Sequence, residues 1–106
     1  MDFSVICGSR SKSEQNRLYC LKKSKLKWPD SKHNVLNKEK SRAVDVAPYI
    51  NGKISYSYYD CCFLAGLILG LGKRMGLRIR WGGNWDNDGE IITDQSFLDL
   101  VHFEIM

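Results

Sequence analysis

The chain has 106 residues, of which 43% are hydrophobic and 26% are charged, with a formal net charge of +4. This length suits one hydrophobic core, so we predict a single domain over residues 1–106. Its most apolar stretch, residues 61–72, is far shorter than the ~20 residues that cross a bilayer, and no signal peptide is visible, so we expect no stable membrane insertion.

The first predicted elements are a strand, a helix and a long polar loop. Residues 2–7 are β-prone and predict a strand that ends in a turn. Ser11 begins a capping-box pattern, and the amphipathic residues after it predict a helix to about residue 26. Pro29 is expected to end this helix, because its ring cannot continue one. The polar segment 31–42 has no apolar periodicity and is predicted to be a loop.

The second half of the chain alternates strands with a long helix. Residues 43–47 predict a strand with Val44 and Val46 on one face and Asp45 on the other. The remaining predicted elements are a hairpin turn at Asn51-Gly52, a short strand at 53–56, an apolar helix from the capping box at Ser57 to about residue 75, a strand at 77–81, a turn-forming loop at 82–89 and a strand at 101–106. This order predicts an α+β domain with a mostly antiparallel sheet packed on two helices.

Two features of composition bear on function. The positive charge, concentrated between residues 22 and 42, favours an anionic partner such as nucleic acid, a membrane surface or a cell-wall polymer, although such a run is more often a solvated face. The four cysteines (Cys7, Cys20, Cys61 and Cys62) lack CxxC spacing, which argues against a cysteine zinc site. We interpret them as small buried hydrophobes of a protein made in a reducing compartment.

Both histidines and one strand carboxylate form a candidate metal site. His33 in a polar loop is more often a surface residue, and His102 in the last strand has the alternative of a hydrogen-bonded core histidine. Asp45 lies between two valines, where a carboxylate is costly to bury unless it is paired with a basic side chain or bound to a metal. Taken together, these residues supply the three N/O ligands of a zinc site with an open fourth position.

Asp99 is a candidate for proton transfer beside that site. A carboxylate near zinc-bound water can accept its proton and pass it to a leaving amine. Residues three apart on a regular strand face opposite sides, so Asp99 shares a site with His102 only if it lies in a turn before the strand. Separately, residues 86–90 (DNDGE) are a weak candidate for binding Ca²⁺, with a solvated acidic loop as the favoured alternative.

Four groups of motifs resemble a known family over nearly the whole chain and in the same order. They are GSR with EQ and LY in residues 8–19, SKHN with AVDVAPY in residues 31–49, RWGGNWD in residues 80–86, and DQSF with DL and HFE in residues 94–104. These motifs resemble the bacteriophage endolysins that are L-alanyl-D-glutamate peptidases of the zinc D-alanyl-D-alanine carboxypeptidase family. The resemblance implies the fold shared with the Hedgehog signalling domain.

The resemblance also implies roles for particular residues. It implies a Zn²⁺ held by His33, Asp45 and His102, with Asp99 as general base. Arg10 then stabilises the oxyanion, with an ordinary surface arginine as the alternative, and Ser31 and Trp85 contact the substrate.

We therefore expect a zinc endopeptidase that cuts the L-alanyl-D-glutamate bond of peptidoglycan stem peptides during phage lysis. The expected enzyme is a monomer that does not bind nucleic acid and that accumulates in the host cytoplasm before it reaches the wall. One alternative is a D-alanyl-D-alanine carboxypeptidase on the same scaffold. The other is a non-catalytic, zinc-bearing domain that binds the cell wall.

Overall fold

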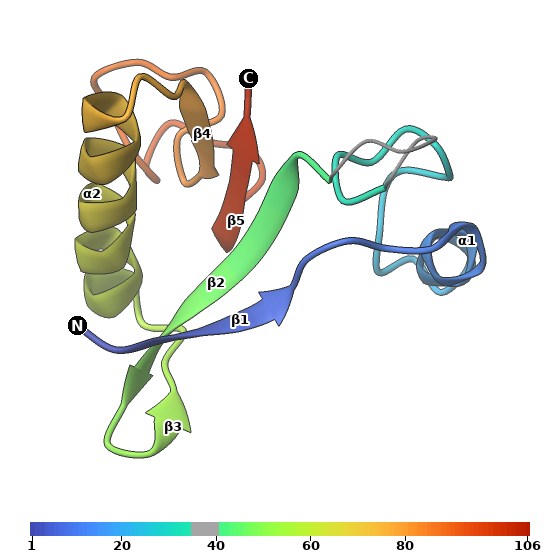
Figure 1. Cartoon of the computed structure of the whole chain (residues 1–106), viewed down its shortest axis with the longest axis horizontal. Coiled ribbons are helices and arrows are strands. Elements are labelled where there is room, and N and C mark those ends of the chain that lie inside the picture. Colours follow the sequence, from blue (N-terminus) through green and yellow to red (C-terminus); the bar gives the residue numbers. More distant parts are fainter. Residues whose placement is uncertain (35–40) are drawn as a thin grey trace.

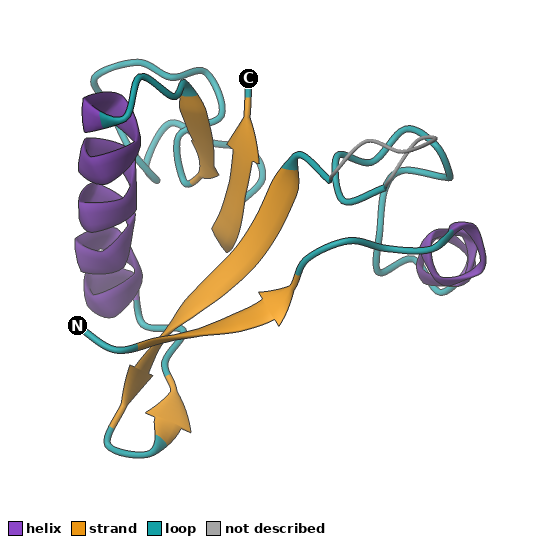
Figure 2. Ribbon diagram, viewed as in Figure 1, coloured by secondary structure: helices purple, strands orange, loops and turns teal. Residues whose placement is uncertain are grey.

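The computed structural model describes residues 1–34 and 41–106 (Figure 1). Within these residues the chain forms two helices and a five-stranded sheet, which confirms the predicted α+β class (Figure 2). The elements, in chain order, are β1 (Phe3–Cys7), α1 (Lys12–Cys20), β2 (Ala43–Ile50), β3 (Lys53–Ile54), α2 (Tyr58–Arg74), β4 (Ile79–Gly82) and β5 (Asp99–Ile105). In the described part of the chain, no helix has the length and hydropathy needed to cross a membrane.

The sheet places β2 between the first and last strands of the chain. Its order is β1-β2-β5-β4, with β3 paired to β2, and every pairing is antiparallel. Figure 1 shows β2 running between β1 and β5. In the β2–β5 register Asp45 lies directly opposite His102, and paired residues of antiparallel strands project from the same face. The pairing therefore brings two of the predicted ligands together.

An irregularity between β4 and β5 positions Asp99. The structure differs here from the sequence prediction, because Asp99 is the first residue of β5 rather than part of a preceding turn. The register shifts between Trp81, which pairs with Phe103, and Gly82, which pairs with Asp99. This shift removes the strict alternation of faces between Asp99 and His102. A Cβ at Gly82 would collide with the carbonyl oxygen of Asp99, so the close approach of the two strands requires glycine.

α2 covers one face of the sheet and supplies two of the five residues of the core cluster. Ser57 caps its N-terminus, as predicted, by accepting a hydrogen bond from the Asp60 N–H. The helix packs against β2, β4 and β5, and the core cluster consists of Val46, Leu64, Ala65, Trp81 and Phe103. At Gly72 the helix comes so close to β4 that a Cβ would collide with the Ile79 side chain, whereas a Cβ at Gly66 or Gly70 would point into open space.

α1 is shorter than predicted and lies beyond the end of β1, away from the sheet (Figure 1). It ends at Cys20, where Lys22 adopts a left-handed backbone (φ 59°) and the N–H of Lys23 bonds the Leu18 carbonyl. The prediction that Pro29 ends the helix was therefore wrong. Residues 35–40 of the predicted loop lie outside the described residues.

The cysteines are less uniformly buried than predicted. All four are free thiols, and Cys61 is buried as expected. Cys7 and Cys62 are half-buried, and Cys20 is exposed because α1 has no sheet face to cover it.

Candidate metal centre and cleft

Asp45 is the centre of the candidate site. Its Oδ1 lies 3.3 Å from Nε2 of His33 and 3.3 Å from Nδ1 of His102. His102 reaches it across the β2–β5 pairing, whereas His33 comes from the loop that follows α1. Two hydrogen bonds hold His33 in place: the Arg10 N–H donates to the His33 carbonyl, and the His33 N–H donates to the Ser31 hydroxyl within the same loop. The structure thus brings together all three predicted ligands.

Hydrogen bonds on the side of each ring away from Asp45 decide which ring nitrogen carries the hydrogen in the neutral histidines. Nδ1 of His33 lies 2.7 Å from the Gly8 carbonyl oxygen, which can only accept, so Nδ1 carries the hydrogen. Nε2 of His102 lies 3.0 Å from a carboxylate oxygen of Glu104 and carries the hydrogen for the same reason. In the neutral rings, the lone pairs of His33 Nε2 and His102 Nδ1 then face the Asp45 carboxylate.

This donor set fits a metal ion. Two imidazole lone pairs and a carboxylate directed at one another leave no hydrogen between them, and a cation satisfies all three groups. In the metal-free protein, burial alone would raise the pKa of Asp45, but hydrogen bonds and positive charge from the two rings in their protonated form lower it below the usual range. Asp45 is therefore ionised near neutral pH and able to act as a ligand.

Glu104 belongs to the candidate site, although the sequence interpretation gave it no role. It is buried and accepts hydrogen bonds from His102, from Lys32 Nζ at 2.8 Å and from Arg80 Nη2 at 2.7 Å. Burial acts against its charge, but these three partners lower the pKa of Glu104 to about 2. A signal was present in the sequence, because a residue two positions after His102 on a strand projects from the same face.

Asp99 lies beside the same centre. One of its carboxylate oxygens lies within 4.8 Å of donor atoms of both Asp45 and His102. Burial and the charge of Asp45 raise the pKa of Asp99 above its usual range. A carboxylate whose pKa is closer to neutral accepts and returns a proton more readily, so the environment suits acid–base work.

Arg10 is held at the edge of the site by Gln15. Nη1 of Arg10 donates to Oε1 of Gln15 at 3.1 Å, and Nη2 lies 3.8 Å from Oδ2 of Asp45. The Nε–H of Arg10 is buried without a partner among the described residues. Gln15 is fully buried, and its Oε1 also accepts from Asn34, the residue after His33. One amide therefore orients both Arg10 and the His33 loop.

A cleft of about 460 Å³ opens onto these residues, and its lining includes the two predicted substrate contacts. Ser31 is buried and supports the His33 loop through its hydroxyl. Trp85 packs against the His102 ring at 5.3 Å and stacks on Phe97 at 6.0 Å, both measured between ring centroids. Trp85 therefore forms an aromatic wall beside the candidate ligands.

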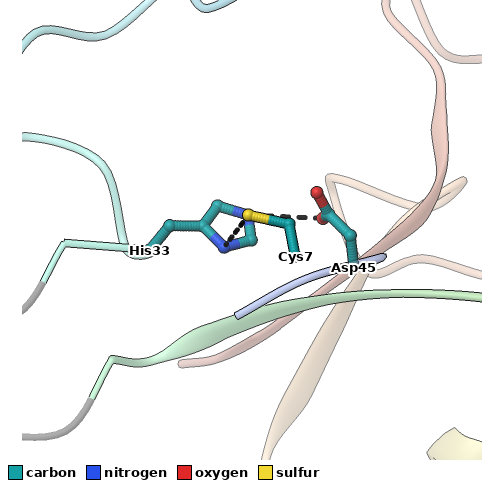
Figure 3. Close-up of side chains that lie close together, drawn as sticks. All are labelled: Cys7, His33 and Asp45. Carbon is teal, nitrogen blue, oxygen red and sulfur yellow. Dashed lines mark hydrogen bonds and ion pairs between the residues drawn. The ribbon is translucent and has the colours of Figure 1, made fainter. Parts of the chain in front are cut away.

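Cys7 lies beside the His33 ring, near Asp45 (Figure 3). Its Sγ is 4.0 Å from Nδ1 of His33, and Cys7, His33 and Asp45 bring donor atoms within 4.8 Å of one another. The sequence analysis considered only the spacing of the cysteines and could not predict this contact. The contact depends on the pairing of Cys7 with Asp45 in the β1–β2 register.

A family model described as phage L-alanyl-D-glutamate peptidase matches residues 1–106. The chain belongs to this family. The L-alanyl-D-glutamate peptidase of Escherichia phage T5 is 28% identical over 90 residues, which are 84% of this chain and 63% of that protein. The L-Ala D-Glu endopeptidase ChiX of Serratia marcescens superposes with a TM-score of 0.76 at 24% identity, over 98% of this chain and 66% of ChiX, and shows the same fold. The chain thus spans less than two thirds of the T5 relative.

Family membership confirms the resemblance read from the motifs.

The acidic loop that was considered for calcium differs in arrangement from the expectation. Asp86 and Asp88 gather with Asp94 in an exposed group, and Glu90 is not part of it. Exposed acidic groups of this kind are common without an ion, so the solvated acidic loop stays the favoured interpretation and calcium binding the weaker alternative.

Proposed function

We propose that this chain is a peptidoglycan endopeptidase that hydrolyses the bond between L-alanine and D-glutamate in stem peptides. Residues 1–106 form its catalytic domain, acting as a monomer on the cell wall after accumulating in the host cytoplasm. The observation that carries the proposal is the convergence of His33 and His102 on the Asp45 carboxylate, inside a cleft, in a chain of this family.

The metal in this proposal is zinc, held by His33 Nε2, the Asp45 carboxylate and His102 Nδ1. Three N/O ligands with room for a fourth are typical of catalytic zinc sites. When bound, zinc polarises a carbonyl group and lowers the pKa of water to about 7. Glu104 and the Gly8 carbonyl keep the two rings in the tautomers that this ligation needs.

The other residues act on the substrate and its protons. Asp99 takes a proton from the attacking water and delivers it to the leaving D-glutamate nitrogen, which its raised pKa favours. Arg10 directs its guanidinium to the negative charge that develops on the scissile carbonyl oxygen. Trp85 and Ser31 position the peptide, the first as an apolar wall and the second through the loop that carries His33.

The test compares wild type with Asp99→Asn on permeabilised Gram-negative cells and on purified peptidoglycan. Asp2→Asn, at an exposed carboxylate that precedes β1 and does not line the cleft, is the matched control. We expect wild type and the control to clear the cells and to release new L-alanine carboxyl ends, and Asp99→Asn to lose activity while it retains about one zinc.

The products and the zinc content separate the alternatives. Release of D-alanine instead of new L-alanine ends would indicate a carboxypeptidase. Zinc without any cleavage by wild type would indicate a wall-binding domain. Failure of wild type to bind zinc would refute the assigned ligand set.

A further inference from the structure

A short basic segment forms one wall of the cleft. After α1 ends, the left-handed turn at Lys22 redirects the chain, so that Lys22, Lys23, Lys25 and Leu26 line the same cavity as His33 and His102. The three lysine side chains are exposed to solvent. We call Lys22, Lys23 and Lys25 the lysine wall.

The lysine wall is fixed to the candidate active site rather than free. Nε2 of the buried Gln15 donates to the Ser24 hydroxyl at 2.8 Å and to the Leu26 carbonyl at 2.5 Å. The same side chain holds Arg10 through its Oε1. Nζ of Lys25 also lies 4.1 Å from the ring centroid of Phe97, which stacks on Trp85. This cation–π contact links the lysine wall to the aromatic side chains of the cleft.

The charges of the cleft leave these lysines available to a ligand. Lys32 and Arg80 both pair with Glu104, and Arg10 approaches Asp45. No carboxylate of residues 1–34 and 41–106 lies within ion-pair distance of the lysine wall. Three cations without anions at the rim of a cleft raise the local concentration of negatively charged ligands.

We propose that the lysine wall binds the free α-carboxylate of D-glutamate and so makes the enzyme selective for unamidated stem peptides. This inference rests on the proposed function. In peptidoglycan the D-glutamate is joined to the next residue through its γ-carboxyl group, so its α-carboxyl is free unless it is amidated. That group belongs to the residue whose nitrogen leaves, so it enters the cleft whenever the scissile bond does. A lysine ammonium donates charge-assisted hydrogen bonds to a carboxylate and only weaker ones to a carboxamide oxygen.

The test uses two synthetic stem peptides that differ only in carrying the α-carboxylate or the α-carboxamide on D-glutamate. Wild type is expected to prefer the carboxylate by about tenfold in kcat/KM, mostly through a lower KM, because charge-assisted hydrogen bonds from solvent-exposed lysines contribute modestly. Replacing the lysine wall (K22Q, K23Q and K25Q together) is expected to abolish the preference and leave kcat/KM for the carboxamide unchanged. The control carries K53Q and K73Q, two exposed lysines on β3 and α2, and is expected to keep the preference.

A binding measurement keeps this result independent of catalysis. Calorimetric titration of both peptides into Asp99→Asn is expected to show the same preference, weakened by added salt. Equal kcat/KM values of wild type for the two peptides would overturn the inference. An unchanged preference for the carboxylate in the triple variant would overturn it as well. A triple variant that loses the carboxamide reaction equally would also overturn it, because the lysines would then act on any wall polymer. If wild type cuts neither peptide the proposed function fails, and the titration still decides the inference.

Discussion

Replacing Glu104 with glutamine tests the electrostatic description of the site. The carboxylate has an ordinary pKa of 4.5, and its three partners lower the pKa to about 2 in the folded protein. One pKa unit corresponds to about 1.4 kcal/mol, so the charge of Glu104 stabilises the fold by up to about 3 kcal/mol at neutral pH. Because the folded pKa is the lower one, this contribution is complete above about pH 4.5 and disappears as the pH falls through about 2.

Urea unfolding of chelator-treated protein measures this effect. At pH 7 we expect Glu104→Gln to be less stable than wild type by about 3 kcal/mol, and we expect the gap to shrink to less than half near pH 3. Protonated glutamate and glutamine have nearly the same shape, so wild type becomes its own control at low pH. Glu90→Gln, at an exposed position, should show no such gap. A gap that is the same at both pH values, or one below about 0.5 kcal/mol at pH 7, would refute the reasoning.

Three further substitutions test the packing around the site. Gly82→Ala should displace Asp99 and lower activity by about 100-fold with metal binding retained. Gly66→Ala, the control, should leave activity unchanged, and full activity of Gly82→Ala would contradict the close contact of the two strands. Gln15→Leu should cost about 2–4 kcal/mol in urea unfolding, because it leaves four hydrogen-bond partners unpaired, and a neutral effect would show that water replaces the amide. Leu64→Ala should cost about 2–5 kcal/mol, and a smaller loss would mean that α2 collapses onto the cavity.

The sequence predicted most elements because their signals are local. Alternation marked β2, the Asn51-Gly52 pair marked its hairpin, and the capping box at Ser57 marked the start of α2. The end of α1 was not predictable in this way. Residues 21–26 have a composition that a helix accepts, but Lys22 takes a left-handed backbone and the buried Gln15 binds Ser24 and Leu26 instead. A tertiary contact thus overrides local propensity.

Some site residues could be predicted from their residue type, whereas others reach the site only through the register of the strands. His33, Asp45 and His102 were recognisable because histidines and a carboxylate between valines are unusual in this chain. Cys7 was not, because only the β1–β2 register places its thiol beside Asp45. The sequence analysis correctly required an irregularity between Asp99 and His102 if the two were to share a site. The irregularity is a register shift rather than a turn, and no local sequence pattern indicates such a shift.

The central position of β2 has a consequence for how the molecule folds. Besides the hairpin partner β3, it pairs with the first and the last strand, and Asp45 and His102 are 57 positions apart in the chain. Pairing over such a separation is slow, because the chain loses much of its freedom before the contacts compensate. The metal-binding atoms therefore meet only when the whole sheet has closed. A metal bound there would cross-link the middle and the end of the chain, and its removal would speed global unfolding rather than loosen one loop.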